Sequence, residues 1–372
     1  MRIGIPTEIR PGETRVAATP ETVKKLAGGN LHSLIVQSGA GTRAHIPDHA
    51  FETAGATIAP TAADVYGQAE LLLKVRGPDQ CEIAMLRPDA SVVGLLAPHD
   101  RAGLDALAQR GVTAFALERL PRITRAQTMD VLSSQANIAG YKAVILAADH
   151  YGRFMPMLMT AAGTVKAARV LVLGAGVAGL QAIATAKRLG AVIEAFDVRP
   201  ATKEQVESLG AKFIEVPVSE DERTQAETTG GYAREMSDDY QRRQAALVDE
   251  RARAADIIIT TALIPGKPAP VLLREETIRA MKPGSVVVDL AVEQGGNCPL
   301  TERDRVVEKH GVTLVGYSNL PAMLAADASA LYARNVLAFV NLLVDPKTGA
   351  LNINRTDEII AGALVCFEGK VL

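Results

Sequence analysis

Residues 168–197 read ARVLVLGAGVAGLQAIATAKRLGAVIEAFD. The run 168–174 is apolar and rich in valine and leucine, and it predicts a buried strand; 179–189 predicts a helix and 191–197 a second strand. The turn carries Gly174, Gly176 and Gly179 in the pattern GxGxxG. Such glycines permit a tight turn, close approach of a pyrophosphate to the backbone, and close packing of helix on strand. The stretch therefore predicts a strand–helix–strand unit that binds a dinucleotide.

The residue that ends the second strand sharpens this interpretation. Asp197 follows the last glycine at the distance where a carboxylate hydrogen-bonds the adenosine ribose 2′-hydroxyl, which favours NAD(H) over NADP(H). The N-terminus of the helix offers free N–H groups to the phosphates. Arg199, two positions on, weakens the argument from charge. A chance GxGxxG at a helix–strand packing site is the alternative.

Alternating elements continue on both sides of this unit. Further strands are predicted at 211–216, 256–261, 285–290 and 312–317, which makes six in this half of the chain. The first 120 residues alternate as well, with strands at 2–5, 34–37, 71–75, 91–96 and 112–117 and helices at 20–26 and 100–110. Strands that alternate with helices indicate parallel sheets built from βαβ units.

The sequence therefore predicts an α/β protein with two Rossmann-like doubly wound parallel-sheet domains joined by long helices. The helices that join the domains are expected within 130–152 and 322–344. The first domain is expected to be discontinuous, with residues 1–135 plus 328–372, and the NAD-binding Rossmann domain spans residues 136–327.

Composition excludes several functional classes. The 372 residues carry 40 basic and 42 acidic side chains, a net charge of -2 that gives no sign of bulk binding to nucleic acid or anionic lipid. Three cysteines without a CxxC pair favour a reducing compartment, and the six histidines show no metal-ligand spacing. No charge-free stretch is as long as the about 20 apolar residues of a membrane span. We therefore expect a soluble chain without a metal.

One segment departs from globular composition. Residues 219–243 are polar, charged and nearly free of aliphatic side chains, as in a disordered surface loop. Gly230, Gly231 and Tyr232 at its centre combine a hinge with an aromatic ring, and a loop near a nucleotide crevice often acts as a lid.

Several charged residues allow a structural role as readily as a functional one. Asp130 and Arg122 lie on the polar connection, where an interdomain salt bridge is the alternative to ligand contact. Solvated surface charge is the default for Arg15 and Lys74. The remaining residues of this kind are His99, expected in a surface loop, and Asp289 and Glu293, expected to cap a turn or helix.

The sequence offers an NAD site but no convincing acid–base pair. Oxidation of an alcohol or amine moves a proton as well as a hydride and therefore needs a positioned acid or base. Direct hydride transfer between two nicotinamides needs only approach, orientation and exclusion of water.

Six segments carry a resemblance that covers nearly the whole chain. They are PRITRAQTMDVLSSQANIAGYKAV (121–144), TAAGTVKAARVLVLGAGVAGLQAIATAKRLGA (160–191), DVRPATKEQVESLGAKF (197–213), GGYAREM (230–236), TTALIPGKPAPVLL (260–273) and DLAVEQGGNCPL (289–300). They resemble the NAD(H)-binding alpha subunit, in its soluble split form, of the Re/Si-specific, proton-translocating NAD(P) transhydrogenase family.

The resemblance implies NAD(H) bound to this chain and NADP(H) bound to a partner beta subunit. It implies a homodimer, peripheral on the cytoplasmic face of the inner membrane, next to a membrane subunit that conducts protons. Hydride would pass directly from NADH to NADP⁺, with the lid closed over the nucleotide.

The resemblance also carries site residues over by position. Those implied to orient the nicotinamide and complete the catalytic arrangement are Arg122, Gln127, Asp130, Ser133 and Tyr232. Those implied to contact NAD(H) are Arg122, Ile123, Thr124, Gln127, Thr128, Met129, Asp130, Gly174, Gly176, Val177, Gly179, Asp197, Val198, Arg199, Gly231, Gln244 and Leu263. The mobile loop of the family matches residues 219–239.

The nearest relative in fold that the resemblance suggests is alanine dehydrogenase. Its substrate-binding cations correspond to Arg15 and Lys74, but its catalytic histidine aligns with Ala97, and His99 lies two residues on. This departure puts amino-acid oxidation in doubt. Three alternatives stay open: an alanine-dehydrogenase-like enzyme, an NAD-sensing module without catalysis and, more remotely, a saccharopine-type dehydrogenase.

Overall fold

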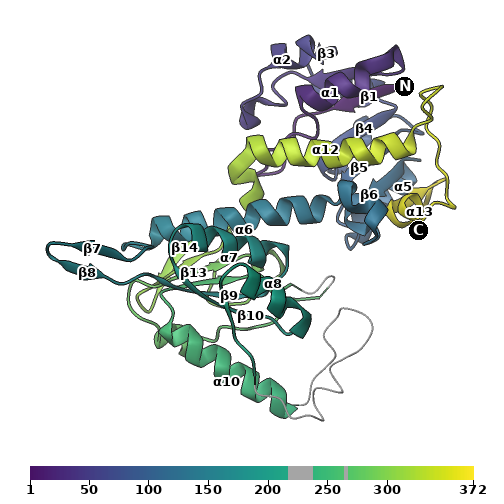
Figure 1. Cartoon of the computed structure of the whole chain (residues 1–372). Helices are drawn as coiled ribbons and strands as arrows, with labels where there is room; N and C mark the ends of the chain where they lie inside the picture. The colour runs from purple at the N-terminus through teal and green to yellow at the C-terminus, as the bar shows by residue number, and fades with distance from the viewer. Residues whose placement is uncertain (217–237, 264–266) are drawn as a thin grey trace. The chain divides into compact units, whose positions relative to one another are not determined.

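A computed structural model describes residues 1–216, 238–263 and 267–372. The chain divides into two compact units: Met1–Gln135 with Pro321–Leu372, and Ala136–Leu320. Figure 1 follows this course from the purple N-terminus to the yellow C-terminus. The chain returns to the first unit at Pro321, whereas the sequence suggested residue 328.

The first unit contains a mostly parallel sheet. Its strands are β1 (Arg2–Ile5), β2 (Ser33–Gln37), β3 (Ala56–Ala59), β4 (Leu71–Arg76), β5 (Ser91–Leu95), β6 (Thr113–Ala116), β16 (Leu364–Phe367) and β17 (Lys370–Val371). Among the described residues their order is β17-β16-β6-β5-β4-β1-β2-β3. Strands β1 to β6 are parallel, and β16 and β17 form an antiparallel edge. The parallel part has the 3-2-1-4-5-6 order of a doubly wound nucleotide-binding sheet.

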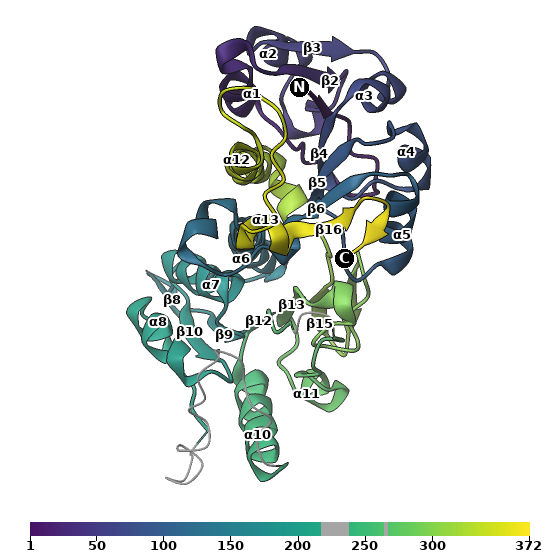
Figure 2. The same cartoon turned by 90° about the vertical axis from the view of Figure 1, so that its right-hand side faces the viewer.

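Helices cover both faces of this sheet. They are α1 (Pro20–Ala27), α2 (Asp48–Thr53), α3 (Ala62–Gln68), α4 (Gln80–Met85), α5 (Arg101–Gln109), α12 (Ala325–Leu343) and α13 (Glu358–Ala363). Leu71 and Leu73 of β4 pack in a core with α1, α2 and α12, whereas Leu72 packs in a second core with α3, α4 and α5. Figure 2 shows these helices on opposite sides of the sheet, as the alternation of side chains along a strand requires.

The second unit repeats the same strand order. Its main sheet consists of β9 (Arg169–Leu173), β10 (Val192–Phe196), β11 (Lys212–Phe213), β12 (Ile257–Thr260), β13 (Val286–Asp289), β14 (Val306–Lys309) and β15 (Val312–Val315). The order within the described residues is β11-β10-β9-β12-β13-β15-β14. All pairs are parallel except β14 with β15. The predicted doubly wound α/β fold is confirmed, with an antiparallel edge strand added to the six predicted strands.

The helices of this unit again flank the sheet. They are α6 (Val131–His150), which begins in the first unit, α7 (Val177–Arg188), α8 (Lys203–Ser208), α10 (Asp238–Ala254) and α11 (Glu275–Arg279). Val170 and Val172 of β9 pack against α6 and α7, and Leu171 packs in the core that α10 and α11 complete. A Cβ atom added at Gly140 would lie 2.1 Å from the carbonyl oxygen of Ala178. Helix α6 therefore approaches α7 as closely as only a glycine allows.

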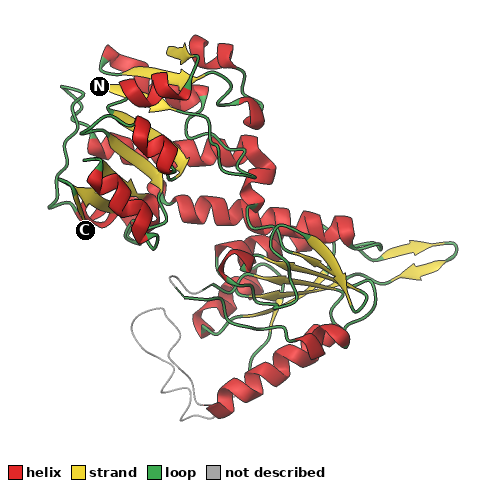
Figure 3. Cartoon of the chain, turned by 180° about the vertical axis from the view of Figure 1, so that it is seen from behind, coloured by secondary structure: helices red, strands yellow, loops and turns green. Residues whose placement is uncertain are grey.

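Two features of the second unit differ from the sequence interpretation. A separate antiparallel hairpin of β7 (Leu158–Thr160) and β8 (Gly163–Val165) extends from the unit, as Figures 1 and 3 show. Its three-residue strands are too short for periodicity to indicate. The polar segment expected to run from 219 to 243 ends earlier, because helix α10 begins at Asp238. Residues 217–237 lie outside the described part of the chain.

Helix α12, with the preceding turn η7 (Leu320–Leu324), is apolar along most of its length. Leu320–Leu343 is long and apolar enough to cross a membrane, the one such segment among the described residues. Tyr332, Phe339 and Val340 of this helix are fully buried in the core of the first unit. Its apolar composition therefore serves packing on the sheet.

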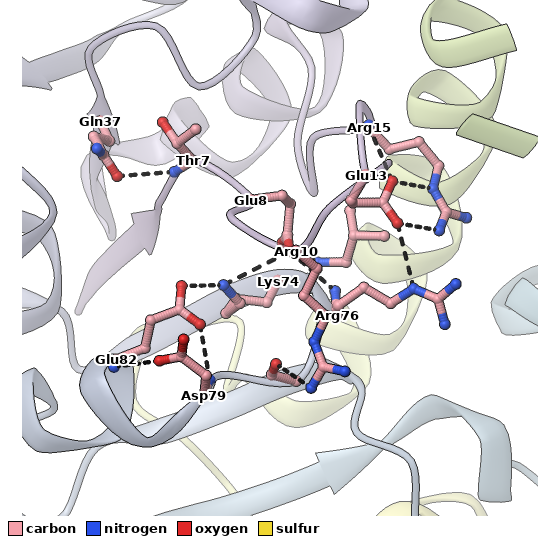
Figure 4. A network of polar contacts seen from close by, with 12 residues as sticks. Thr7, Glu8, Arg10, Glu13, Arg15, Gln37, Lys74, Arg76, Asp79 and Glu82 are labelled. Atoms are coloured by element: carbon pink, nitrogen blue, oxygen red, sulfur yellow. Dashed lines mark hydrogen bonds and ion pairs between the residues drawn. The ribbon is translucent and has the colours of Figure 1, made fainter. Parts of the chain in front are cut away.

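The first unit also contains a buried cluster of charged residues, drawn in Figure 4. Arg15 is 2% exposed; its Nε and Nη2 atoms donate to the two carboxylate oxygens of Glu13 at 2.7 and 2.6 Å, and its Nη1 donates to Gln135 at 2.8 Å. Burial opposes ionisation of Glu13, but the hydrogen bonds and charge of Arg15 lower its pKa to about 2. The expectation of a solvated Arg15 was wrong, because the carboxylate two residues away satisfies the guanidinium inside the protein.

Lys74 of β4 is equally enclosed, with 1% exposure. Its ammonium group lies 2.6 Å from a carboxylate oxygen of Glu82, which also accepts a hydrogen bond from Tyr66 at 2.5 Å. Glu8 lies 3.7 Å away and accepts hydrogen bonds from the backbone N–H groups of Val75 and Arg76. Lys74 is therefore a paired interior charge and not the surface charge that the sequence suggested.

Substitution of Gly140 tests the close approach of the two helices. We expect Gly140→Ala to lower the free energy of unfolding by about 1–3 kcal/mol, because the added methyl group overlaps a backbone oxygen. Gly67→Ala on α3 is the matched control, since a Cβ atom there meets no atom within 4 Å. That variant should gain about 0.5–1 kcal/mol from lower backbone entropy. Equal shifts in melting temperature for both variants would contradict the packing assignment.

The Glu13–Arg15 pair predicts a dependence of stability on pH. The folded pKa of Glu13, about 2, lies below the unfolded value of about 4.3, so the pair stabilises the fold above pH ~4 and loses this effect as the pH falls towards 2. Glu13→Gln should cost about 3 kcal/mol at pH 7 and progressively less below pH ~4. Urea unfolding at several pH values measures the difference. The exposed Glu52→Gln is the control and should show no such trend.

Candidate dinucleotide site

The loop after β9 has a shape that only glycines allow. Gly174 has a φ of +104°, and a Cβ atom there would lie 2.4 Å from the hydroxyl oxygen of Thr261. A Cβ atom at Gly179 would lie 1.8 Å from the carbonyl oxygen of Gly174. The first and last glycines of the motif thus provide the tight turn and the close packing of helix on strand that the sequence predicted.

The middle glycine leaves open space. Gly176 is the N-cap residue of α7, and a Cβ atom there would meet nothing within 4 Å. The first N–H groups of a helix have no partner within the helix, and they carry a partial positive charge. A pyrophosphate can therefore approach the backbone between Gly176 and the start of α7.

Asp197 follows β10 and is bound to this loop. One carboxylate oxygen accepts the backbone N–H of Ala175 at 2.7 Å and the Nη2 of Arg199 at 2.9 Å; the other accepts the backbone N–H and Nε of Arg199 at 2.8 and 2.9 Å. Burial acts to raise the pKa of Asp197, but these hydrogen bonds outweigh it and lower the pKa below its ordinary value. The carboxylate is therefore ionised at neutral pH and fixed beside the glycine loop.

Exposed apolar side chains surround the same end of the sheet. Val177, Val198 and Leu263 are 40%, 44% and 45% exposed, unusually high for their type. They follow the neighbouring strands β9, β10 and β12, at the point where the strand order reverses. Ligands of doubly wound sheets bind at this switch point, beyond the carboxyl ends of the strands. These side chains offer apolar surface for the flat rings of a dinucleotide.

A side chain that sequence reasoning missed holds the loop after β12. Asn297 accepts the backbone N–H of Ala262 at 3.2 Å and donates to the carbonyl oxygens of Ala262 and Pro270 at 2.9 and 2.8 Å. A buried asparagine that replaces a backbone partner has no signature in the sequence alone. Asp289 binds the backbone N–H groups of Ala291 and Cys298, which confirms its expected capping role.

The segment predicted to contact the nicotinamide belongs to the first unit. Residues Thr124–Met129 form the 3-10 helix η4, and Asp130 then accepts the backbone N–H and hydroxyl of Ser133 at 2.9 and 2.6 Å. This capping interaction begins helix α6. Arg122 forms no ion pair within the described residues, so the alternative of an Arg122–Asp130 bridge is wrong.

Other residues of this segment face different surroundings. Arg122, Thr124, Gln127 and Thr128 are exposed, Ile123 is half-buried, and Met129 is buried in the core of the first unit. Arg125, which the sequence did not single out, forms a bidentate pair with Asp357 at 2.6 and 2.8 Å. Met129 therefore offers a ligand its backbone and not its side chain.

The remaining predicted residues differ in what can be said of them. Gly231 and Tyr232 lie outside the described residues. Gln244 is half-buried on α10, and the exposed Leu263 is the last described residue before 264–266. His99 is exposed, as expected, and Ala97 has a φ of +51°. The three cysteines are free, and the described residues contain no group of three or more His, Cys, Asp or Glu side chains suited to a metal.

Two family models match the chain in sequence. Alanine dehydrogenase/PNT, N-terminal domain, matches residues 4–139, and alanine dehydrogenase/PNT, C-terminal domain, matches residues 143–372. The first of the split polypeptides of NAD(P) transhydrogenase subunit alpha from Rhodospirillum rubrum is 53% identical over 378 residues, with 100% of this chain and 98% of that protein covered. Alanine dehydrogenase of Mycolicibacterium smegmatis is 30% identical over 380 residues, with 100% and 95% covered.

Solved structures agree with these matches. The transhydrogenase from Sinorhizobium meliloti matches with a TM-score of 0.90 at 49% identity and covers 100% of both chains. An L-alanine dehydrogenase matches with a TM-score of 0.83 at 26% identity, covering 100% of this chain and 97% of that one. Similarity over the whole length, in sequence and in fold, shows that the chain belongs to the alanine dehydrogenase/PNT family.

Proposed function

We propose that this chain is the NAD(H)-binding alpha subunit of a proton-translocating NAD(P) transhydrogenase. The observation that carries the proposal is the glycine loop with an ionised carboxylate bound to its backbone, in a chain 53% identical along its length to such a subunit. Within the proposal, NADP(H) is bound by a partner beta subunit and a membrane subunit conducts protons. The chain works as a homodimer on the cytoplasmic face of the membrane.

The residues of the second unit fit the adenosine half of NADH. The space at Gly176 and the N–H groups of α7 accept the pyrophosphate. The ribose hydroxyls donate to the Asp197 carboxylate, which would repel a 2′-phosphate. Val177, Val198 and Leu263 shield the rings from water. Arg122, Gln127, Asp130 and Ser133 of the first unit are proposed, on the resemblance, to orient the dihydronicotinamide, and Tyr232 and Gly231 to close over it.

NADH supplies a hydride from C4 of its dihydronicotinamide, and the C4 of NADP⁺ accepts it with both bonding electrons. No proton enters or leaves this step, so the protein has only to bring the rings together and exclude water. The position where the sequence resemblance expects the catalytic histidine of alanine dehydrogenase is occupied by Ala97, whose N–H donates to Glu118. This departure supports transhydrogenation over an alanine-dehydrogenase-like activity.

Isotope transfer tests the proposed reaction. NADH deuterated at the transferred position is mixed with the chain, the NADP(H)-binding subunit and NADP⁺. We expect deuterium in NADPH without loss to water, because the hydride passes directly between the rings. Mass spectrometry of the product measures the transfer. Oxidation of NADH by the isolated chain with pyruvate and ammonium, and not with NADP⁺ and the partner, would instead establish the dehydrogenase alternative.

Two arginines of the same segment provide a matched test of the nicotinamide contact. Arg122→Ala should lower the rate of hydride transfer by about 10–100-fold, the usual cost of losing an orienting contact, and leave the melting temperature unchanged. Arg125→Ala removes the pair with Asp357 and should leave the rate within about twofold. Stopped-flow rates and thermal melts of both variants measure this. Equal rates for Arg122→Ala and wild type would exclude Arg122 from the site.

A further inference from the structure

The ribose carboxylate and its neighbouring arginine form an unusually complete pair. Arg199 uses its backbone N–H, Nε and Nη2 to bind both oxygens of Asp197, at 2.8 to 2.9 Å. The remaining interaction of the carboxylate is with Ala175 in the glycine loop. The side chain of Arg199 is 38% exposed, whereas that of Asp197 is 5% exposed. The guanidinium thus lies at the solvent side of the carboxylate, where the 2′ position of a bound adenosine ribose would lie.

The next cation along the chain is engaged elsewhere. Lys203, at the start of α8, lies 2.7 Å from Glu215. The guanidinium of Arg199, in contrast, is held by the ribose carboxylate itself. Its planar fork of N–H donors fits a phosphate as well as a carboxylate.

We propose that Arg199 is a latent ligand for a 2′-phosphate and that Asp197 determines nucleotide specificity by occupying it. The carboxylate acts in two ways: its charge repels the phosphate of an NADP-type dinucleotide, and its two oxygens hold the guanidinium that would otherwise bind that phosphate. This inference rests on the proposed binding of NAD(H) at the glycine loop. It assigns to one ion pair a selectivity that sequence reasoning assigned to Asp197 alone.

The geometry predicts how the selectivity can be reversed. Asp197→Asn keeps a carbonyl oxygen that can accept the Ala175 N–H, so the loop is retained, but it removes the charge that holds Arg199. The released guanidinium can then turn to a 2′-phosphate. Charge-assisted hydrogen bonds are about twice as strong as neutral ones, so an arginine that gains a phosphate partner changes affinity strongly.

The experiment is titration calorimetry of the full-length chain with NADH and with NADPH. Four variants are compared with wild type: Asp197→Asn, Arg199→Ala, the double variant, and Glu204→Gln as a control that removes an exposed carboxylate on the same segment. We expect Asp197→Asn to bind NADPH at least about tenfold more tightly than wild type and NADH more weakly. The double variant, Arg199→Ala and Glu204→Gln should gain no affinity for NADPH.

The outcomes separate the inference from the function on which it rests. A gain in NADPH affinity by the double variant equal to that of Asp197→Asn would show that loss of repulsion is sufficient, which would overturn the role of Arg199. No gain by Asp197→Asn, with an unchanged melting temperature and wild-type NADH binding intact, would also overturn it while leaving the proposed function standing. Failure of the wild-type chain to bind NADH would refute the proposed function itself.

Discussion

The second unit depends on the contact between two backbone segments that leaves no room for a side chain. Gly179 on α7 lies so close to the carbonyl of Gly174 that even a methyl group would overlap it. This contact sets where helix α7 begins, and therefore where its free N–H groups point. Asp197 reaches the same loop through the Ala175 N–H, and Thr261 reaches it through the carbonyl of Gly174. Strands β9, β10 and β12 are thus joined at one turn.

The two units share a strand order but differ in the segment after their first strand. In the second unit, the glycine loop turns directly into a helix whose N-terminus faces open space. In the first unit, β1 is followed by an extended segment with Glu8, Glu13 and Arg15, whose charges are satisfied by one another and by neighbouring residues in the interior. The same sheet therefore supports an open anion site in one unit and a closed charge cluster in the other. Doubly wound topology alone assigns neither outcome.

The sequence predicted the central strands because they are long, apolar and buried on both faces. It missed the edges: β3, β14, β16 and β17 are short or mixed in polarity, and their pairing is decided by neighbours far away in the chain. It also placed Arg15 and Lys74 at the surface, because a pattern shows a charge but not the Glu13 or Glu82 carboxylate that compensates it. Partners brought together only by folding are beyond reach of a local pattern.

Asp130 illustrates a more general relation between structural and functional roles. The sequence offered two alternatives for it, ligand contact or an ion pair, whereas the structure gives a third, the N-terminal cap of α6 through Ser133. This role is compatible with ligand contact, because a carboxylate already held by two hydrogen bonds loses little entropy when a ligand binds. The same holds for Asp197, which is bound to Ala175 and Arg199 before any nucleotide arrives. In both places the hydrogen bonds that stabilise the local fold also fix an acceptor for a ligand, so the structural explanation of such a residue does not argue against a functional one.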